Sequence, residues 1–241
     1  MDIKAIYNVI DLIAPFSEAE EWDNSGILVD SGKDIKKALF CLDASLPVIK
    51  EAIEKGVDLI VSHHPLIFDP LYKIEKGSPI SLLIKNEISL ISAHTNLDKS
   101  GISVSTAEKL GLTDISSDGF LVSGNTETIS AGELAGKCKE ILGCPNVRYT
   151  EKEDIKKVAF VSGSGGSFLS EALKKGADAL ITGDIKHDVF IEANNKGIAL
   201  IDAGHYSTEK IFIKEFAKNV GEKADIEIIL SEKEEIPFKT I

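Results

Sequence analysis

The residues of this chain best suited to chemistry are its five histidines, which are His63, His64, His94, His187 and His205. Each histidine falls at or just after the carboxyl end of a predicted strand, and open α/β sheets carry their ligand-binding loops at those ends. A single histidine at such a place more often caps a loop than binds a ligand. Because all five occupy such places, the pattern indicates a shared site.

Carboxylates accompany two of these histidines. Asp98 follows His94 by four residues in HTNLD, and Glu209 follows His205 by four residues in HYSTE. If a helix begins near Tyr206, the second pair lies on one helical face. Imidazole and carboxylate ligands without cysteine suit Zn, Mn, Fe, Co or Ni and exclude a thiolate cluster. Three histidines and two carboxylates provide more ligands than one catalytic ion needs, and they are enough for two divalent ions.

The elements that must position these residues follow an α/β pattern. Short apolar runs alternate with segments of helical period, which is typical of largely parallel strands covered on both faces. Strands are predicted over 36–43, 57–62 and 88–93, with helices between them. The second of these strands delivers His63 and His64 at its carboxyl end.

The second half of the chain repeats this order. The strand at 156–163 resembles the strand at 36–43, and the E-A-x-x-K-G-x-D string of 51–58 recurs 120 positions later. Any helix, glycine and strand look somewhat alike, but the fixed register favours an internal duplication. The fold class predicted is therefore α/β, with two related α/β/α lobes over 1–120 and 121–241, largely parallel central sheets and a metal cleft between the lobes.

Three segments outside the histidine motifs also carry expectations. The stretch TDISSDGFLVSGNTETIS is polar and turn-rich, so the boundary is expected near 115–130, before a helix in AGELAGKCKEILG. The C-terminal tail reads as a strand plus an acidic extension, and it can pack back on the first lobe. In WDNSG, Trp22 is interpreted as a core or interface residue, with Asn24 and Ser25 as cleft-lining groups.

Composition limits the partners. The chain has 241 residues and a formal net charge of -12, with 39 acidic against 27 basic residues. This field repels nucleic acid and anionic membranes. No apolar run approaches the roughly 20 residues that a bilayer requires, and no signal sequence is recognisable, so a cytoplasmic location is expected. Because Arg148 is the only arginine, metal, lysine or backbone N–H groups must meet any anionic substrate.

Substrate-binding candidates occur in the second half of the chain. Ser164 and Gly165 belong to GSGGS, a strand-to-helix connection whose N–H groups either cradle a phosphate or simply form a tight turn. Asp184, Lys186 and His187 in GDIKHD are either hydrogen-bonding partners of metal ligands, substrate contacts or structural residues.

The motifs SHHP at 62–65, HTNLD at 94–98, GDIKHD at 183–188 and DAGHYSTE at 202–209 resemble those of the Nif-three-like family, also labelled GTP cyclohydrolase type-two homologues. The likeness covers essentially the whole chain. It implies a two-lobed protein with a dinuclear metal centre, assembled as a toroidal homohexamer, in a short form without the domain that many bacterial members carry between the halves. The metal ligands that the resemblance implies are His63, His64, Asp98, His205 and Glu209.

Together these patterns predict a dinuclear metal-dependent hydrolase acting on a small phosphorylated or nucleotide-like molecule. Two divalent ions would activate water and polarise the scissile phosphoryl group or ring carbon. His94 or His187 is the predicted general acid, because imidazole titrates near neutral pH. The alternative is a non-catalytic metal-binding ring that serves as a scaffold for a protein or nucleic-acid partner.

Overall fold

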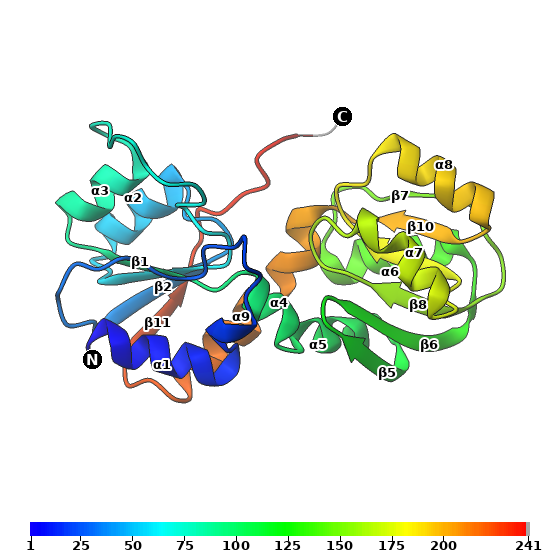
Figure 1. Ribbon diagram of the computed structural model, residues 1–241, viewed down its shortest axis with the longest axis horizontal. Helices are drawn as coiled ribbons and strands as arrows, with labels where there is room; N and C mark the ends of the chain where they lie inside the picture. The colour runs from blue at the N-terminus through cyan, green and yellow to red at the C-terminus, as the bar shows by residue number, and fades with distance from the viewer. Residues whose placement is uncertain (240–241) are drawn as a thin grey trace. The chain divides into compact units, whose positions relative to one another are not determined.

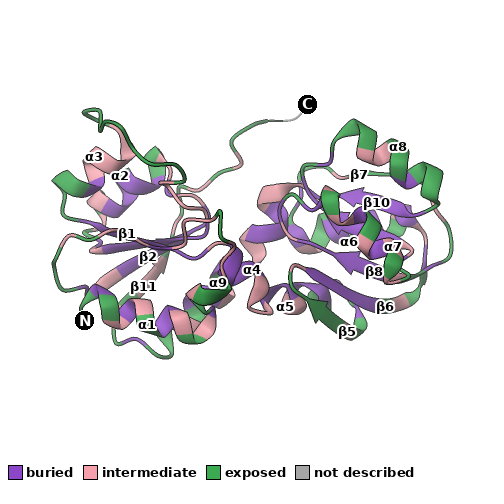
Figure 2. Ribbon diagram, viewed as in Figure 1, coloured by how far each residue is buried: buried purple, intermediate pink, exposed green. Residues whose placement is uncertain are grey.

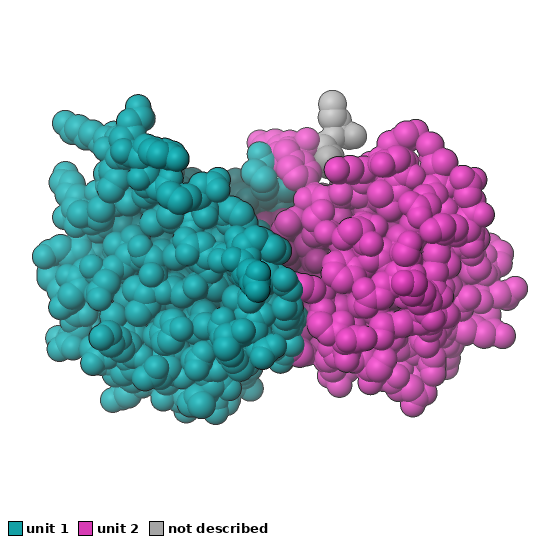
Figure 3. Space-filling model, viewed as in Figure 1, with its two compact units in different colours: residues 1–100, 213–237 teal, residues 101–212, 238–241 magenta. Residues whose placement is uncertain are grey.

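The computed structural model describes residues 1–239 and divides them into two compact units, each built on its own sheet (Figures 1 and 3). Unit 1 comprises 1–100 and 213–237, and unit 2 comprises 101–212 with a short piece from residue 238 onward. The sequence placed the boundary at 120/121, whereas the structure divides the chain after Ser100 and returns it to unit 1 at Ile213.

The sheet of unit 1 has five strands in the order β1-β4-β3-β2-β11. The strands are β1 (Gly26–Val29), β2 (Lys37–Cys41), β3 (Leu59–Ser62), β4 (Ser89–Ser92) and β11 (Glu227–Leu230). Strands β11, β2, β3 and β4 run parallel, and β1 pairs antiparallel with β4 at the edge. Strands β3 and β4 are buried at every residue, as expected of parallel strands covered on both faces (Figure 2).

The helices of unit 1 include the two that were predicted between its parallel strands. They are α1 (Ile3–Ile13), α2 (Leu46–Glu54), α3 (Pro79–Lys85) and α4 (Thr95–Lys99), with a 3₁₀ turn at Phe16–Glu18. Asp2 caps α1 by accepting the Ala5 N–H, and Ile3, Ile6 and Ile10 on one face of this helix are buried. Helices α2 and α3 each carry proline in the first turn, where its missing N–H costs nothing.

The sheet of unit 2 has six strands in the order β5-β6-β8-β9-β10-β7. The strands are β5 (Thr113–Asp118), β6 (Leu121–Ile129), β7 (Arg148–Tyr149), β8 (Ile155–Phe160), β9 (Ala179–Thr182) and β10 (Ala199–Asp202). Strands β8, β9 and β10 are parallel, and the outer pairings are antiparallel. The mixed α/β class with parallel strands at the centre of each sheet is confirmed.

The helices of unit 2 cover this sheet and lead back to unit 1. They are α5 (Ile102–Lys109), α6 (Ala131–Leu142), α7 (Leu169–Lys174), α8 (His187–Lys196) and α9 (His205–Gly221), with a 3₁₀ turn at Gly166–Phe168. Helix α6 is the helix predicted in AGELAGKCKEILG, and a capping box between Ser130 and Glu133 begins it. Within residues 1–239, none of the helices combines the length and the apolar character needed to cross a lipid bilayer.

The segment expected to be a turn-rich boundary is instead an antiparallel hairpin, so that expectation was wrong. Strands β5 and β6 pair around a turn in which Gly119 adopts a φ of 59°. Strand β5 reads as polar because it lies at the sheet edge, where only Ile115 is partly buried. In β6, by contrast, Leu121 and Val122 are fully buried.

The predicted duplication appears as matched hydrogen bonds in the two units. In unit 1, Asp58 Oδ2 accepts the N–H groups of residues 36 and 37 at 2.9 and 3.0 Å. In unit 2, Asp178 Oδ2 accepts those of residues 156 and 157 at 2.9 and 3.0 Å. Each aspartate follows a helix and ties the beginning of its own strand to that of the neighbouring parallel strand, which explains why the string recurs at a fixed register.

The C-terminal tail returns to unit 1 and is anchored by Glu51. Strand β11 pairs with β2, and the buried Glu51 carboxylate then accepts the Ser231 hydroxyl at 2.6 Å and the N–H groups of Glu232 and Lys233 at 3.0 and 3.2 Å. Burial raises the pKa of Glu51, but hydrogen bonds from Lys55, Ser231 and Glu232 outweigh it and lower the pKa to about 2. The tail is therefore held by a carboxylate that stays ionised.

Candidate metal centre

Unit 1 brings three histidines together at the carboxyl end of its sheet. His63 and His64 follow β3, and His94 follows the neighbouring parallel strand β4. One ligand atom of each lies within 4.8 Å of those of the other two, and the ring centroids are 4.9, 5.1 and 5.5 Å apart. Parallel neighbours end at the same edge, so the strand-end rule predicted this cluster.

The imidazoles of His63 and His64 are each fixed through Nδ1. His63 Nδ1 donates to the Ala93 carbonyl at 2.9 Å, and His64 Nδ1 donates to Asp43 Oδ1 at 2.8 Å. A carbonyl oxygen only accepts hydrogen bonds, so Nδ1 of His63 carries the proton, and a neutral ring then has its lone pair on Nε2. Metal-binding histidines show this same arrangement, with an oxygen acceptor on the other ring nitrogen.

Asp23 performs the same task for His94. Its carboxylate accepts His94 Nδ1 at 2.8 Å, the Thr95 hydroxyl at 2.6 Å and the Ser25 hydroxyl at 2.7 Å. Burial raises the pKa of Asp23, but the hydrogen bonds from His94, Thr95 and Ser25 prevail and hold this pKa well below its usual range. The WDNSG motif thus supports a histidine through its aspartate.

Trp22 of the same motif is not a core residue, as 60% of it is exposed. The core alternative was wrong because the neighbouring Asp23 turns towards His94 and leaves the indole outside. Trp22 meets His94 edge-on, with ring centroids 6.2 Å apart, and contacts Phe68 at 6.0 Å. Asn24 donates through its amide to the Ile67 carbonyl at 2.6 Å, so it fixes a loop.

Asp98 completes the donor groups of unit 1. It is buried in α4, and its Oδ1 lies 3.7 Å from Nε2 of His63. That separation is too long for a hydrogen bond. Two lone-pair-bearing atoms held side by side in a buried place suit joint coordination of one cation, so the donor set fits a metal ion.

Unit 2 supplies a second pair of donors on α9. His205 Nε2 lies 3.0 Å from Glu209 Oε2, and Nδ1 of His205 donates to Asp184 Oδ2 at 2.8 Å. The predicted one-turn pairing on a helical face is therefore present. Because the Nδ1 proton is directed to Asp184, a neutral ring has its lone pair on Nε2, beside the buried Glu209 carboxylate.

One glycine lets the backbone pass close to this pair, and a second glycine of the same loop packs against β9. A Cβ on Gly163 would lie 2.3 Å from Glu209 Oε1, and this residue has a φ of +63°. A Cβ on Gly165 would lie 2.5 Å from the Thr182 hydroxyl, to which the Gly165 N–H donates at 2.7 Å. Gly165, predicted to bind substrate, thus packs against β9, whereas Gly163 makes room for the Glu209 carboxylate.

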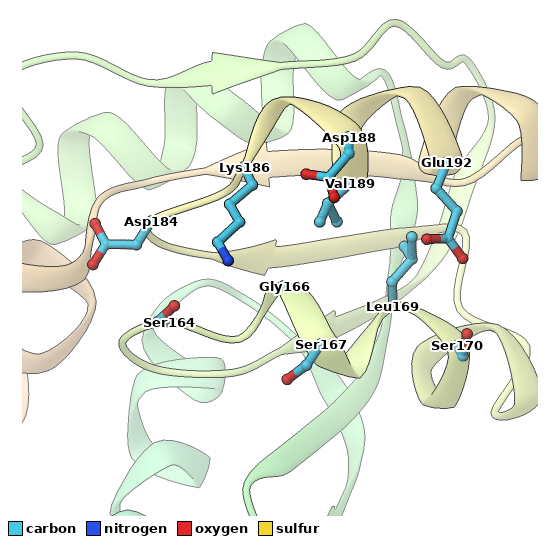
Figure 4. Close-up of a pocket in the computed structure, with 10 residues that line it drawn as sticks. All are labelled: Ser164, Gly166, Ser167, Leu169, Ser170, Asp184, Lys186, Asp188, Val189 and Glu192. Atoms are coloured by element: carbon cyan, nitrogen blue, oxygen red, sulfur yellow. The ribbon is translucent and has the colours of Figure 1, made fainter.

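A pocket of about 340 Å³ lies beside Asp184 in unit 2 (Figure 4). Three of the four predicted substrate residues, Ser164, Asp184 and Lys186, line it together with the α8 carboxylates Asp188 and Glu192. Figure 4 shows the Lys186 side chain directed towards the loop of Ser164. One lysine, several hydroxyl groups and several carboxylates therefore face the same space.

His187 stands apart from these groups. It is the first residue of α8 and is exposed, and within residues 1–239 it belongs to none of the clusters of possible metal ligands. Its role as a general acid stays a prediction. His94, the other predicted acid, lies in the histidine cluster of unit 1.

Sequence reasoning missed Asp43 and the role of Asp23. Asp43 follows β2, the parallel neighbour of β3, so the rule that located the histidines also applied to this aspartate. The signal was therefore present in KKALFCLD. For Asp23, which precedes β1, only the polar character of WDNSG was available.

Two parallel-centred α/β units with histidine and carboxylate donors at their strand ends define a class of possible metal-binding proteins. The chain belongs to the family described as Duf34/NIF3 (NGG1p interacting factor 3), whose family model matches residues 1–237. A "GTP cyclohydrolase 1 type 2 homolog" of Clostridium perfringens is 37% identical over 262 residues and is covered completely, as is this chain. The "GTP cyclohydrolase 1 type 2" of Helicobacter pylori strain J99 is 37% identical over 87% of this chain and 88% of its own.

Solved structures agree with this assignment. The chain resembles the Staphylococcus aureus hypothetical protein SA1388 with a TM-score of 0.92 and 32% identity, over 100% of this chain and 99% of that one. It resembles reduced HcgD from Methanocaldococcus jannaschii with a TM-score of 0.84 and 35% identity, over 96% and 98% of the two chains. The predicted family is thus confirmed.

Proposed function

We propose that this protein is a dinuclear metal-dependent hydrolase acting on a small phosphorylated or nucleotide-like molecule. The observation that carries the proposal is the orientation of His63, His64 and His205, whose Nδ1 atoms donate to oxygen acceptors and leave Nε2 as the atom that would bind metal. The names of the relatives, which refer to GTP, support a nucleotide-like substrate.

The ligand set follows the family resemblance. We propose that two divalent transition-metal ions, from among Zn, Mn, Fe, Co and Ni, are held by His63, His64, Asp98, His205 and Glu209. When bound, such ions would lower the pKa of a water molecule and polarise the phosphoryl group or ring carbon to be attacked. Asp43 and Asp184 would keep the imidazoles of His64 and His205 in the ligating tautomer and orientation.

Other residues would handle the substrate and its protons. We assign the general acid to His94, with His187 as the second candidate, because His94 lies among the histidines of unit 1. Lys186 is the cation proposed to meet a phosphate, since the single arginine, Arg148, is already paired with Asp202. The serine hydroxyls and carboxylates of the same pocket suit the hydroxyl groups of a sugar.

The test combines metal content with turnover. Elemental analysis of gently purified protein should find two transition-metal ions per chain, and a panel of phosphoesters and nucleotides should reveal turnover that a chelator removes. His64→Ala and Glu209→Gln should each lower metal affinity by at least the roughly 10- to 100-fold typical of losing a supporting partner. Recovery of one ion or none, even after reconstitution, would defeat the dinuclear proposal.

A metal-binding scaffold without turnover is the second candidate, favoured by one observation. The loop after His64 exposes Phe68, Leu71, Tyr72 and Ile74. Exposed apolar groups of this extent often mark a surface that binds another protein. If the wild type turns over none of the panel substrates, and the ligand variants lose only metal and oligomer stability, the scaffold replaces the enzyme.

We also propose that the protein acts in the cytoplasm as a homohexamer. Its three cysteines are free and buried, which suits a reducing compartment. The hexamer rests on the family resemblance, and no nucleic-acid or membrane partner is expected at a net charge of -12.

A further inference from the structure

The C-terminal tail reaches the residues that hold His64. After the segment anchored by Glu51, Oε1 of Glu234 accepts the N–H groups of both Leu42 and Asp43, the latter at 2.8 Å. Hydrogen bonds to a carboxylate are stronger than those to a neutral acceptor. The two residues that follow β2 are therefore fixed by a side chain almost 200 positions away, since the sequence separations are 192 and 191.

The same two residues contact His64 from their other side. The Leu42 carbonyl accepts the His64 N–H at 2.9 Å, and Asp43 Oδ1 accepts His64 Nδ1 at 2.8 Å. Backbone and ring of His64 thus both depend on this dipeptide. Any shift of the Asp43 backbone would move the acceptor that holds the imidazole.

The tail is well anchored for this task. Glu51 accepts hydrogen bonds from residues 231–233, so the backbone that leads into Glu234 is held in position. Glu234 also lines a pocket of about 390 Å³ together with Asp43 and His64. Its neighbour Glu235 lines this pocket too but is exposed, which provides a matched control.

We propose that Glu234 is a positioning residue for His64: it fixes the Leu42–Asp43 backbone, and thereby keeps the Asp43 carboxylate where it accepts the hydrogen bond from Nδ1 and leaves Nε2 as the ligand atom. The inference deepens the proposed function, because it rests on His64 being a metal ligand. It assigns to the acidic tail a role beyond that of a solvated extension.

The experiment compares Glu234→Ala, Glu234→Gln and Glu235→Ala with the wild type. Titration with Mn or Zn should show an affinity about 10- to 100-fold lower for Glu234→Ala, the loss typical of a supporting partner. Glu234→Gln keeps an oxygen acceptor and should stay within about threefold of the wild type. In metal-free protein, NMR should show faster solvent exchange of the His64 Nδ1 proton in Glu234→Ala alone.

A double-mutant cycle with Asp43→Ala tests whether Glu234 acts on His64 through Asp43. If Glu234 acts through Asp43, the double variant should lose no more metal affinity than Asp43→Ala alone. Unchanged affinity and proton exchange in Glu234→Ala, equal losses in Glu235→Ala, or additive losses in the cycle would overturn the inference. A wild type that binds no metal would refute the proposed function instead, and the proton exchange measured without metal would still decide the role of Glu234.

Discussion

At the scale of single residues, the recurring device is an imidazole whose Nδ1 is bound to an oxygen. His64 and His205 lie in different units, yet each donates to an aspartate at 2.8 Å. A carboxylate partner fixes the tautomer and raises the basicity of the ligating nitrogen. The aspartates should therefore matter nearly as much as the histidines for metal binding.

Asp184→Asn tests this expectation in unit 2. Asp184 has a φ of 52°, which asparagine tolerates and alanine does not, so the substitution removes the charge without straining the backbone. We expect metal affinity to fall about 10-fold or more, measured by competition with a chelator. Asp188→Asn, which alters the same pocket without touching His205, should bind metal as the wild type does. Equal affinities for both variants would contradict the prediction.

Acid should release the anchor of the tail. The pKa of Glu51 is lowered from 4.5 to about 2, so its stabilising contribution is complete above about pH 4.5 and disappears as the pH falls towards 2. A shift of this size contributes on the order of 3 kcal/mol at neutral pH. Denaturant unfolding at pH 6 and pH 3 should show a smaller loss of stability for Glu51→Gln than for the wild type.

Glu171→Gln is the control for that measurement. Glu171 occupies the position equivalent to Glu51 in the duplicated unit but is only partly buried and does not hold a tail. Its variant should lose stability with acid as steeply as the wild type does. Identical pH dependence in all three proteins would show that the Glu51 anchor contributes little.

At the scale of elements, the loop from β8 to α7 shows how closely the backbone approaches the donors. A Cβ on Gly163 would meet Glu209 Oε1 at 2.3 Å, whereas a Cβ on Gly166 would find its nearest atom at 3.8 Å. We expect Gly163→Ala to displace the Glu209 carboxylate and reduce metal affinity at least 10-fold, while the fold persists. Gly166→Ala should be neutral. Metal titration with circular dichroism as a check on folding decides between these outcomes.

Much of the element structure could be predicted from the sequence, because strand ends and repeated strings are local signals. The clustering of His63 and His94 followed from adjacent parallel strands. Asp43 also follows a predicted strand, so the same rule applied to it, but its partner could not be named from periodicity alone, because the pairing with His64 depends on β2 lying beside β3. The hairpin at 113–129 was missed for a related reason, since an exposed edge strand has the composition of a loop.

At the scale of the whole molecule, assembly is the main open prediction. Light scattering should give a mass close to six times the 26.0 kDa chain. The loop with exposed Phe68, Leu71 and Tyr72 provides apolar surface that association would bury. A clean monomer at micromolar concentration would show that the hexamer does not apply to this chain.

The division of the chain also has a consequence for its synthesis. Nearly all of unit 2 is the continuous stretch 101–212, whereas unit 1 needs residues 213–237 for completion. On the ribosome, β2 therefore emerges long before its neighbour β11 and waits with an unpaired edge, while residues 101–212 are already available to fold. Because Glu234 is made 191 residues after Asp43, the surroundings of His64 are completed only after residues 101–212 have been made. The unit that emerges first thus depends on a segment that is made after most of the second unit.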